Sequence, residues 1–192
     1  MSRWEPDARH RLENAALELF LEHGYDHVTV PEITARAGLT TRTFFRHFVD
    51  KREVLFADAD QMPTFAARLV LDAPPELTPM ELFARGLPML ASAFEGRRDL
   101  LKQRQAIVNG NDGLRERELR KMERLVDAIA EAFRSRGIDD LTAAVVAETA
   151  VGVVKVALRR WVDSNGREPL STIMATSLDR ISDAFDQFHQ RR

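Results

Sequence analysis

Arginine side chains are spaced within one short stretch of the chain in a way that suits contact with nucleic acid. Arg42 and Arg46 are four residues apart and would share one face of a helix, while Phe44 and Phe48 would share another face, which we expect to pack in the core. Residues 36–52 contain five basic side chains against one acidic one, although the whole 192-residue chain has a net charge of −2. Neutralising phosphates requires such a local excess of cations. The pattern therefore predicts a nucleic-acid interface confined to one part of the chain.

Other chemistry is poorly supported by the residues present. The chain has no cysteine, which excludes disulfides, thiolate metal sites and cysteine nucleophiles. We see no nucleophile elbow, phosphate-binding loop or metal-ligand spacing, so we expect no catalytic residue, cofactor or metal site. The first residues lack the apolar core of a signal peptide, and the apolar stretch 143–154 is too short and interrupted to span a bilayer. We therefore expect a cytoplasmic protein with no membrane partner.

The elements that must position these residues are helices. Apolar residues recur at spacings of three and four through most of the chain, and no stretch alternates with a period of two. One such helix covers Arg9–His23 and stops at Gly24. We predict an all-α protein of about nine helices with no sheet.

Residues 29–48 have the signals of two short helices joined by a tight turn. Thr29 and Glu32 form a capping box at the start of the first helix, and Gly38 supplies the left-handed residue that ends it. Thr40 then caps a second helix that runs to about His47. This is a helix-turn-helix, whose second helix meets base edges near its start. The side chains presented there are Thr41, Arg42, Thr43 and Arg46.

A further helix is expected to begin near Asp50 and to connect two domains. Asp50 and Glu53 form a second capping box, which places Lys51 at a helix start where backbone N–H groups point outward. Pro63 should end or kink this helix. We predict a helix-turn-helix DNA-binding domain and a helical effector-binding and dimerisation domain, covering residues 8–55 and 56–192.

The stretch from Arg11 to Leu55, with AALELF, TVPEITARAGLTTRTFFRHF and DKREVLF, resembles the tetracycline-repressor (TetR) family. The resemblance implies two such modules on an all-helical, ligand-binding homodimer. It further implies a regulator, most often a repressor, that binds inverted-repeat operator DNA and is released by a small apolar or amphipathic effector. Phe45 stands where the family usually has tyrosine. DNA contacts are implied for Thr29, Thr40, Thr41, Arg42, Thr43, Phe45, His47 and Lys51, and the residue pattern adds Arg46.

Two apolar seams near the carboxyl terminus predict a dimer interface. One helix is hydrophobic nearly all round over residues 141–154, so it must be covered on more than one side. Two helices with seams of this kind suit a four-helix interface between two chains, and the resemblance implies the same pair. The alternative is packing within one chain only. The predicted interface residues are Val151, Val154, Leu158, Met174, Leu178, Ile181 and Phe185.

Aromatic, methionine and polar-tipped residues of the middle helices are candidates for the lining of an effector pocket. Met and Phe adapt to apolar ligands of varied shape, but any helical core contains them as well. The candidates are Phe65, Phe83, Met89, Phe94, Leu101, Gln105, Asn109, Met122 and Trp161.

These observations favour a sequence-specific transcriptional regulator. The alternative is an enzyme or a helical protein-binding scaffold that does not bind DNA. A scaffold has no need of a basic recognition helix, so salt-dependent binding to a palindromic duplex separates the two hypotheses.

Overall fold

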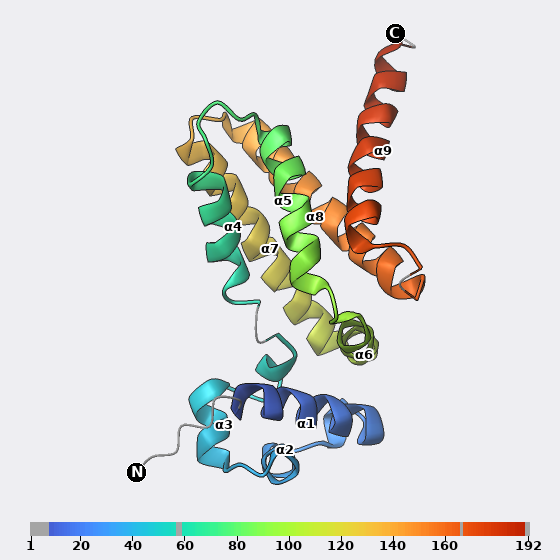
Figure 1. Cartoon of the computed structure of the whole chain (residues 1–192). Helices are drawn as coiled ribbons and strands as arrows, with labels where there is room; N and C mark the ends of the chain where they lie inside the picture. Colours follow the sequence, from blue (N-terminus) through green and yellow to red (C-terminus); the bar gives the residue numbers. More distant parts are fainter. Residues whose placement is uncertain (1–7, 57–58, 166, 191–192) are drawn as a thin grey trace. The chain divides into compact units, whose positions relative to one another are not determined.

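The computed structural model describes residues 8–56, 59–165 and 167–190, with the backbone alone for residues 184–190. Within these ranges the chain forms nine α-helices and two short 3-10 turns, with no strand (Figure 1), which confirms the predicted all-α class. The elements are α1 (Ala8–His23), η1 (Tyr25–His27), α2 (Val30–Ala37), α3 (Thr41–His47), η2 (Glu53–Phe56), α4 (Met62–Leu71), α5 (Pro79–Phe94), α6 (Arg98–Asn109), α7 (Asp112–Ser135), α8 (Asp140–Asp163) and α9 (Leu170–Gln190).

The described chain divides into two compact units. The first contains the described residues up to Asp60 together with Lys102–Arg120, and the second contains Gln61–Leu101 and the described residues from Lys121 onward. The boundaries fall within α6 and within α7, so each of these helices contributes residues to both units. The predicted functional division between residues 55 and 56 stays a prediction.

Helix α1 forms the centre of the first unit. Its buried side chains recur at helical spacing, and Leu12, Ala16 and Phe20 are at most 3% exposed. This face packs against α2 and α3, where Ile33 and Phe44 are fully buried. The helix ends as predicted at His23, because Gly24 follows with a positive φ of 81°.

The helix expected to begin near Asp50 is not formed: the described residues between Asp50 and Met62 contain the short 3-10 turn η2 and no α-helix, so that prediction was wrong. The Asp50 carboxylate accepts the backbone N–H groups of Arg52 and Glu53 at 2.8 and 3.2 Å, but the turn it caps is only η2. The Glu53 carboxylate pairs with Arg117 of α7. Pro63 lies in the first turn of α4, where a missing N–H costs no hydrogen bond.

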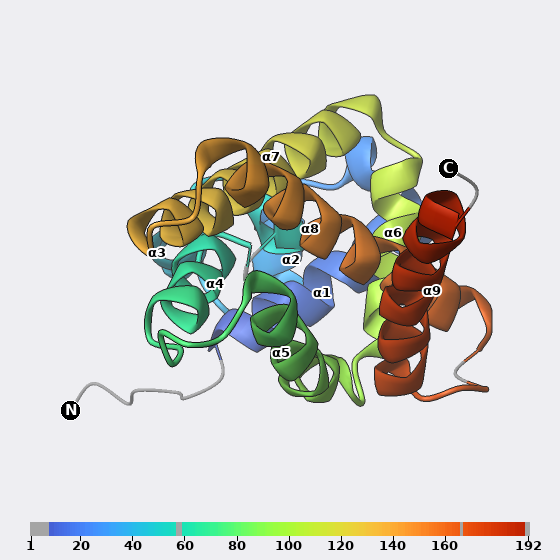
Figure 2. The same cartoon turned by 90° about the horizontal axis from the view of Figure 1, so that it is seen from above.

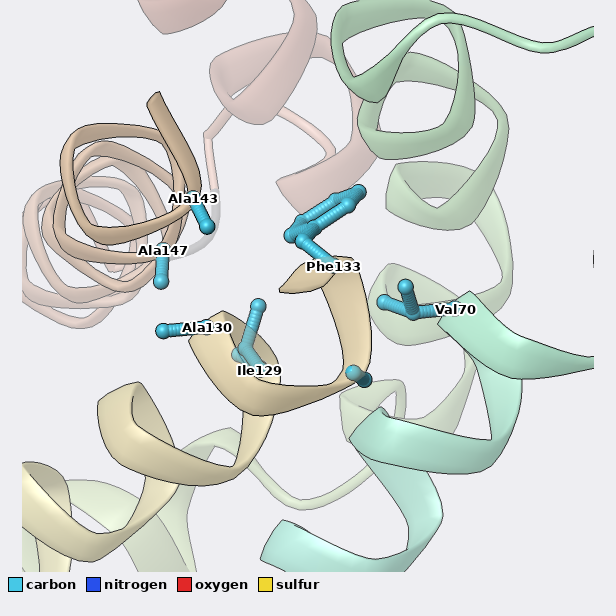
Figure 3. Packing of buried hydrophobic residues seen from close by; sticks show 7 residues of the cluster. Val70, Ile129, Ala130, Phe133, Ala143 and Ala147 are labelled. Carbon is cyan, nitrogen blue, oxygen red and sulfur yellow. The ribbon is translucent and has the colours of Figure 1, made fainter. Parts of the chain in front are cut away.

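The second unit contains two apolar clusters. In one, Val70 of α4 packs with Phe133 of α7, and Ala143 and Ala147 of α8 face Ala130 of α7 (Figure 3). In the other, α9 packs against α5 and α8 (Figure 2), and the contacts centre on side chains that are at most 7% exposed. These are Leu87, Ala91, Ala157, Trp161, Leu170, Ile173 and Met174.

Helix α8 is longer and more apolar than the sequence pattern indicated. It covers 24 residues, and its mean hydropathy reaches 1.8, so by length and composition it could cross a membrane. Core helices of water-soluble proteins meet the same criterion. One face of α8, with Ala143, Ala147 and Ala157, is fully buried in the chain, while the opposite face exposes Val145 and Val156.

Candidate nucleic-acid interface

The helix-turn-helix is built by local signals that the sequence analysis identified. At the start of α2 the Glu32 carboxylate accepts the backbone N–H and the hydroxyl of Thr29, each at 2.7 Å, and these bonds lower the pKa of Glu32. Gly38 ends α2 with φ of 65°, a left-handed conformation that favours glycine. The N–H of Leu39 then donates to the carbonyl of Thr34 at 2.8 Å, which closes the turn between the helices.

Helix α3 is held in place by its cap and by two buried rings. The Thr40 hydroxyl accepts the backbone N–H of Thr43 at 3.2 Å, and the two threonine hydroxyls lie 3.0 Å apart. Phe44 and Phe48, 0% and 3% exposed, lie with ring centroids 5.4 Å apart. The predicted core role of these two rings is confirmed.

The outer surface of α3 combines two cations with one apolar ring. Thr41, Arg42, Phe45 and Arg46 are all exposed, and Phe45 has 57% of its surface accessible. Neither Arg42 nor Arg46 has an ion-pair or hydrogen-bond partner among the residues that the structure describes. Their full charge is thus available to a polyanion such as DNA.

The remaining arginines of the basic stretch are already paired within the chain. Arg36 donates to Glu22 at 2.8 Å and to Glu18 at 3.2 Å, and Arg52 donates to Asp50 at 2.6 Å. Among the arginines of this stretch, only the two of α3 have no carboxylate partner in the described part of the chain.

Lys51 lies in an environment that the sequence did not indicate. Its Nζ donates to the backbone carbonyls of Tyr25 and Val28 at 2.8 and 2.9 Å, with a longer contact of 3.4 Å to Asp26. The ammonium also lies 4.3 Å from the centroid of the Tyr25 ring, and burial raises the pKa of Tyr25 to about 12. In this state Lys51 joins the start of η2 to η1, and the phosphate contact implied for it stays a prediction.

His47, at the end of α3, is partly buried. Its Nε2 atom is buried and has no hydrogen-bond partner among the described residues. Burial, together with the positive charges of Arg46 and Arg9, lowers the pKa of His47. The imidazole is therefore mainly neutral at pH 7, so any phosphate contact that it makes in this state is a hydrogen bond rather than an ion pair.

The sequence analysis missed the side chains that join the segment Lys102–Arg120 to the rest of the first unit. Arg104 donates to the carbonyl of Leu55 at 2.6 Å, and its guanidinium lies 4.8 Å from the Phe56 ring centroid. The same guanidinium donates to Glu118 at 2.8 Å, and Arg117 pairs with Glu53. These partners are many residues apart in sequence, so no local spacing could have revealed them.

The candidate pocket residues fall into separate environments. Phe83, Phe94 and Leu101 pack around Trp161 in one cluster of the second unit. In the same unit Phe65 and Met89 are 47% and 56% exposed, and Met122 is partly buried. The two polar-tipped candidates belong to the first unit, where Gln105 donates to Asn109 at 2.9 Å.

The predicted dimer residues mostly face the core of their own chain. Met174 is fully buried, so it has no surface to offer a partner. Val151 packs against the cluster of the second unit that contains Phe133. Three more of the predicted residues pack against the cluster that contains Trp161, namely Val154, Leu158 and Leu178. Ile181 is partly buried, and the Phe185 side chain lies outside the described residues.

A capped helix-turn-helix whose second helix exposes arginines, unpaired as far as the described residues go, is the arrangement of a DNA-binding transcriptional regulator. Residues 13–57 match the family model described as bacterial regulatory proteins of the tetR family, and residues 77–186 match the MftR C-terminal domain. The chain belongs to the TetR family of bacterial regulators, as its resemblance indicated, and carries a C-terminal domain of the MftR type.

Individual relatives agree with this assignment. The HTH-type transcriptional regulator TcmR of Streptomyces glaucescens is 28% identical over 186 residues, which cover 90% of this chain and 82% of TcmR. FadR of Thermus thermophilus, a repressor solved with lauroyl-CoA, is 25% identical with a TM-score of 0.56, covering 89% of this chain and 91% of its own. FadR of Bacillus subtilis, solved with stearoyl-CoA, has a TM-score of 0.61 at 19% identity, and the match covers 88% of this chain and 95% of FadR.

Proposed function

We propose that this regulator is a cytoplasmic repressor that binds an inverted-repeat operator as a homodimer and leaves it when a small apolar or amphipathic effector binds. The observation that carries the proposal is the outer surface of α3, where Arg42 and Arg46 are exposed and unpaired among the described residues. A short helix covers only a few base pairs, so two copies are needed to specify a site.

The proposed DNA contacts fall into two groups, contacts to base edges and contacts to the sugar-phosphate backbone. Arg42 reads a guanine through O6 and N7, with Thr41 and Phe45 beside it, and Arg46 contacts base or phosphate. The other proposed contacts are to the sugar-phosphate backbone of the duplex, and they are made by Thr29, Thr40, Thr43, His47 and Lys51. To reach a phosphate, Lys51 must first leave the carbonyls that it binds.

Selection of a bound duplex from a random pool tests this function directly. We expect an inverted repeat to emerge, and the logarithm of its binding constant should fall linearly with the logarithm of the salt concentration. A pool from which no sequence is enriched would favour the alternative of a scaffold or enzyme that does not bind DNA.

The outer face of α8 is the surface that we propose for dimerisation, in place of the seam that packs inward. Leu141, Val145 and Val156 are 73%, 55% and 59% exposed and lie on one stripe with Gly152. A Cβ atom added at Gly152 would meet nothing within 4 Å in the described chain. Gly152→Leu should thus leave the monomer folded while it blocks close approach of a second helix. Light scattering should then report a monomer.

The effector proposal rests on the apolar side chains of the second unit. Phe65 on α4 and Met89 on α5 remain exposed, so a ligand could bury them together with the aromatic cluster around Trp161. The FadR relatives are solved with acyl-CoA thioesters, so these amphipathic compounds are the first probes to use.

Reciprocity provides the test of the switch. An effector that releases the operator must bind more weakly when the operator is present, by the same factor. Titration of lauroyl-CoA and stearoyl-CoA with and without operator measures that factor, and we expect a change of about 5–150-fold. Binding that is equal in both titrations would mean that the thioester is not the effector.

A further inference from the structure

The Phe45 ring is exposed but held in a defined orientation. It lies edge-to-face against Phe44, with ring centroids 5.4 Å apart and an interplanar angle of 82°. Phe44 is fully buried, so it fixes one side of the exposed ring. A ring that is already oriented loses little side-chain entropy when it binds a partner.

The position of Phe45 places it beside the arginine that reads bases. Phe45 and Arg42 are three residues apart on α3, so their side chains are neighbours on the helix surface. Both are exposed, and Arg42 has no partner among the described residues. A duplex that brings guanine to Arg42 therefore brings an adjacent base pair to Phe45.

The chemistry of a phenyl ring limits what it can recognise there. Phenylalanine has no donor, so it cannot form the hydrogen bond to phosphate that a phenol hydroxyl would. On the base edges of the major groove, the apolar group is the C5-methyl of thymine. An apolar ring gains free energy by burying that methyl from water.

We propose that Phe45 is a specificity-determining residue that reads the C5-methyl group of a thymine next to the guanine read by Arg42. The proposal rests on the proposed DNA-binding function and adds the chemistry of one base pair in each half-site. Burial of one methyl group corresponds to about a fourfold gain in affinity.

Deoxyuridine substitution tests the proposal because it removes the methyl group and leaves the base pairing intact. Each thymine of the selected operator is replaced singly by deoxyuridine, and the affinity of the full chain is measured by fluorescence anisotropy. We expect one position per half-site, adjacent to a guanine whose replacement by 7-deazaguanine also weakens binding, to lower the affinity about fourfold.

Variants assign that effect to the ring. Phe45→Ala should lose the sensitivity to deoxyuridine, while Phe45→Leu, which keeps an apolar side chain, should retain part of it. Val49→Ala is the matched control, because Val49 is 84% exposed just after α3 and should keep the full sensitivity when truncated. Thermal melting checks that each variant is folded.

Two results would overturn the proposal while DNA binding stands. One is an operator in which no thymine methyl affects affinity, and the other is a Phe45→Leu or Phe45→Ala variant with undiminished sensitivity. If no duplex is selected at all, the proposed function fails and this inference fails with it.

Discussion

Helices α3 and α8 both expose apolar side chains, but the surroundings of those side chains differ. On α3 the exposed ring of Phe45 lies between Arg42 and Arg46, which have no partner in the described part of the chain, on a helix of seven residues. On α8 the exposed valines, Val145 and Val156, lie on the same stripe as Gly152, on a helix of 24 residues. The first surface is short and cationic, whereas the second is long, carries the exposed Glu148 among its valines and leaves room for close backbone approach at Gly152.

This difference indicates which kind of partner each surface suits. Free cations around an apolar group match a polyanion that also presents apolar base edges, which describes the major groove. A glycine between valines on a long helix matches another helix, and a single self-complementary face produces a closed dimer. The predictions below test whether the two surfaces really have separate partners.

The largest effect is expected from charging the α8 face. Val145→Glu combined with Val156→Glu should leave the monomer folded, since both positions are exposed, but should place unpaired carboxylates in the proposed interface. Each monomer would then bind only a half-site, and operator affinity should fall by about two orders of magnitude or more. Sedimentation measures the dissociation and anisotropy measures the affinity.

Met80→Glu on α5 is the matched control for that experiment. Met80 is 48% exposed, comparable to the two valines, but lies outside the proposed interface. It should change neither the oligomeric state nor the affinity. A double-glutamate variant that remains dimeric and binds its operator fully would show that α8 is not the dimer surface.

The next largest effect on operator affinity is expected from replacing Arg42, which has no partner among the described residues, compared with replacing Arg36, which is paired. Arg42→Ala should cost about 1–3 kcal/mol at the specific site and relax the preference at one base pair. Arg36→Ala is the control, because Arg36 is already paired with Glu18 and Glu22 and should contribute little to the affinity. Binding to operators substituted at each base pair measures both outcomes. Equal losses for the two variants would remove the distinction between free and paired cations.

These contrasts also explain how far the sequence could predict the molecule. The Thr29–Glu32 box, Gly38 and Thr40 act within a few residues, so they predict α2 and α3 directly, and both helices are confirmed. Periodicity along α8 predicts a helix but not which stripe faces a partner, because that depends on residues of other helices, such as Leu87 of α5 and Met174 of α9.

The interaction partners of individual basic side chains were harder still to predict from the sequence. The carbonyls that hold Lys51 belong to η1 and to Val28, which follows it, and they are 23 or more residues away. The Leu55 carbonyl that Arg104 binds is 49 residues away. Such pairs depend on tertiary packing rather than on spacing. A basic residue in a basic stretch therefore indicates a DNA contact only when the fold leaves it unpaired.

Lys51 gives a smaller test of this rule. Lys51→Met should lower the free energy of unfolding of the DNA-binding module by about 1–2 kcal/mol, because carbonyls of η1 lose a charged donor. The salt slope of operator binding should also fall by about one unit, because the proposed function has Lys51 leave these carbonyls for a phosphate. Thermal melts and salt titrations measure the two quantities separately. An unchanged slope would mean that Lys51 stays on the carbonyls and does not contact DNA.

The smallest effect concerns His47, whose pKa is lowered by burial and by the charges of Arg46 and Arg9. Since the folded-state pKa lies below the unfolded value of about 6.5, the unfolded chain binds the proton first as the pH falls. The free energy of unfolding should therefore be highest above about pH 6.5 and should decrease on acidification until the folded-state pKa is passed.

His47→Gln removes the titrating group and should flatten that part of the stability profile, which urea unfolding of the full chain at several pH values measures. Operator phosphates would act in the opposite direction, because a nearby anion favours the protonated imidazole. If His47 contacts phosphate, operator binding should then strengthen on acidification in the wild type but not in His47→Gln. If operator affinity varies with pH in the same way for the two proteins, His47 does not contact a DNA phosphate and serves only the packing of α3.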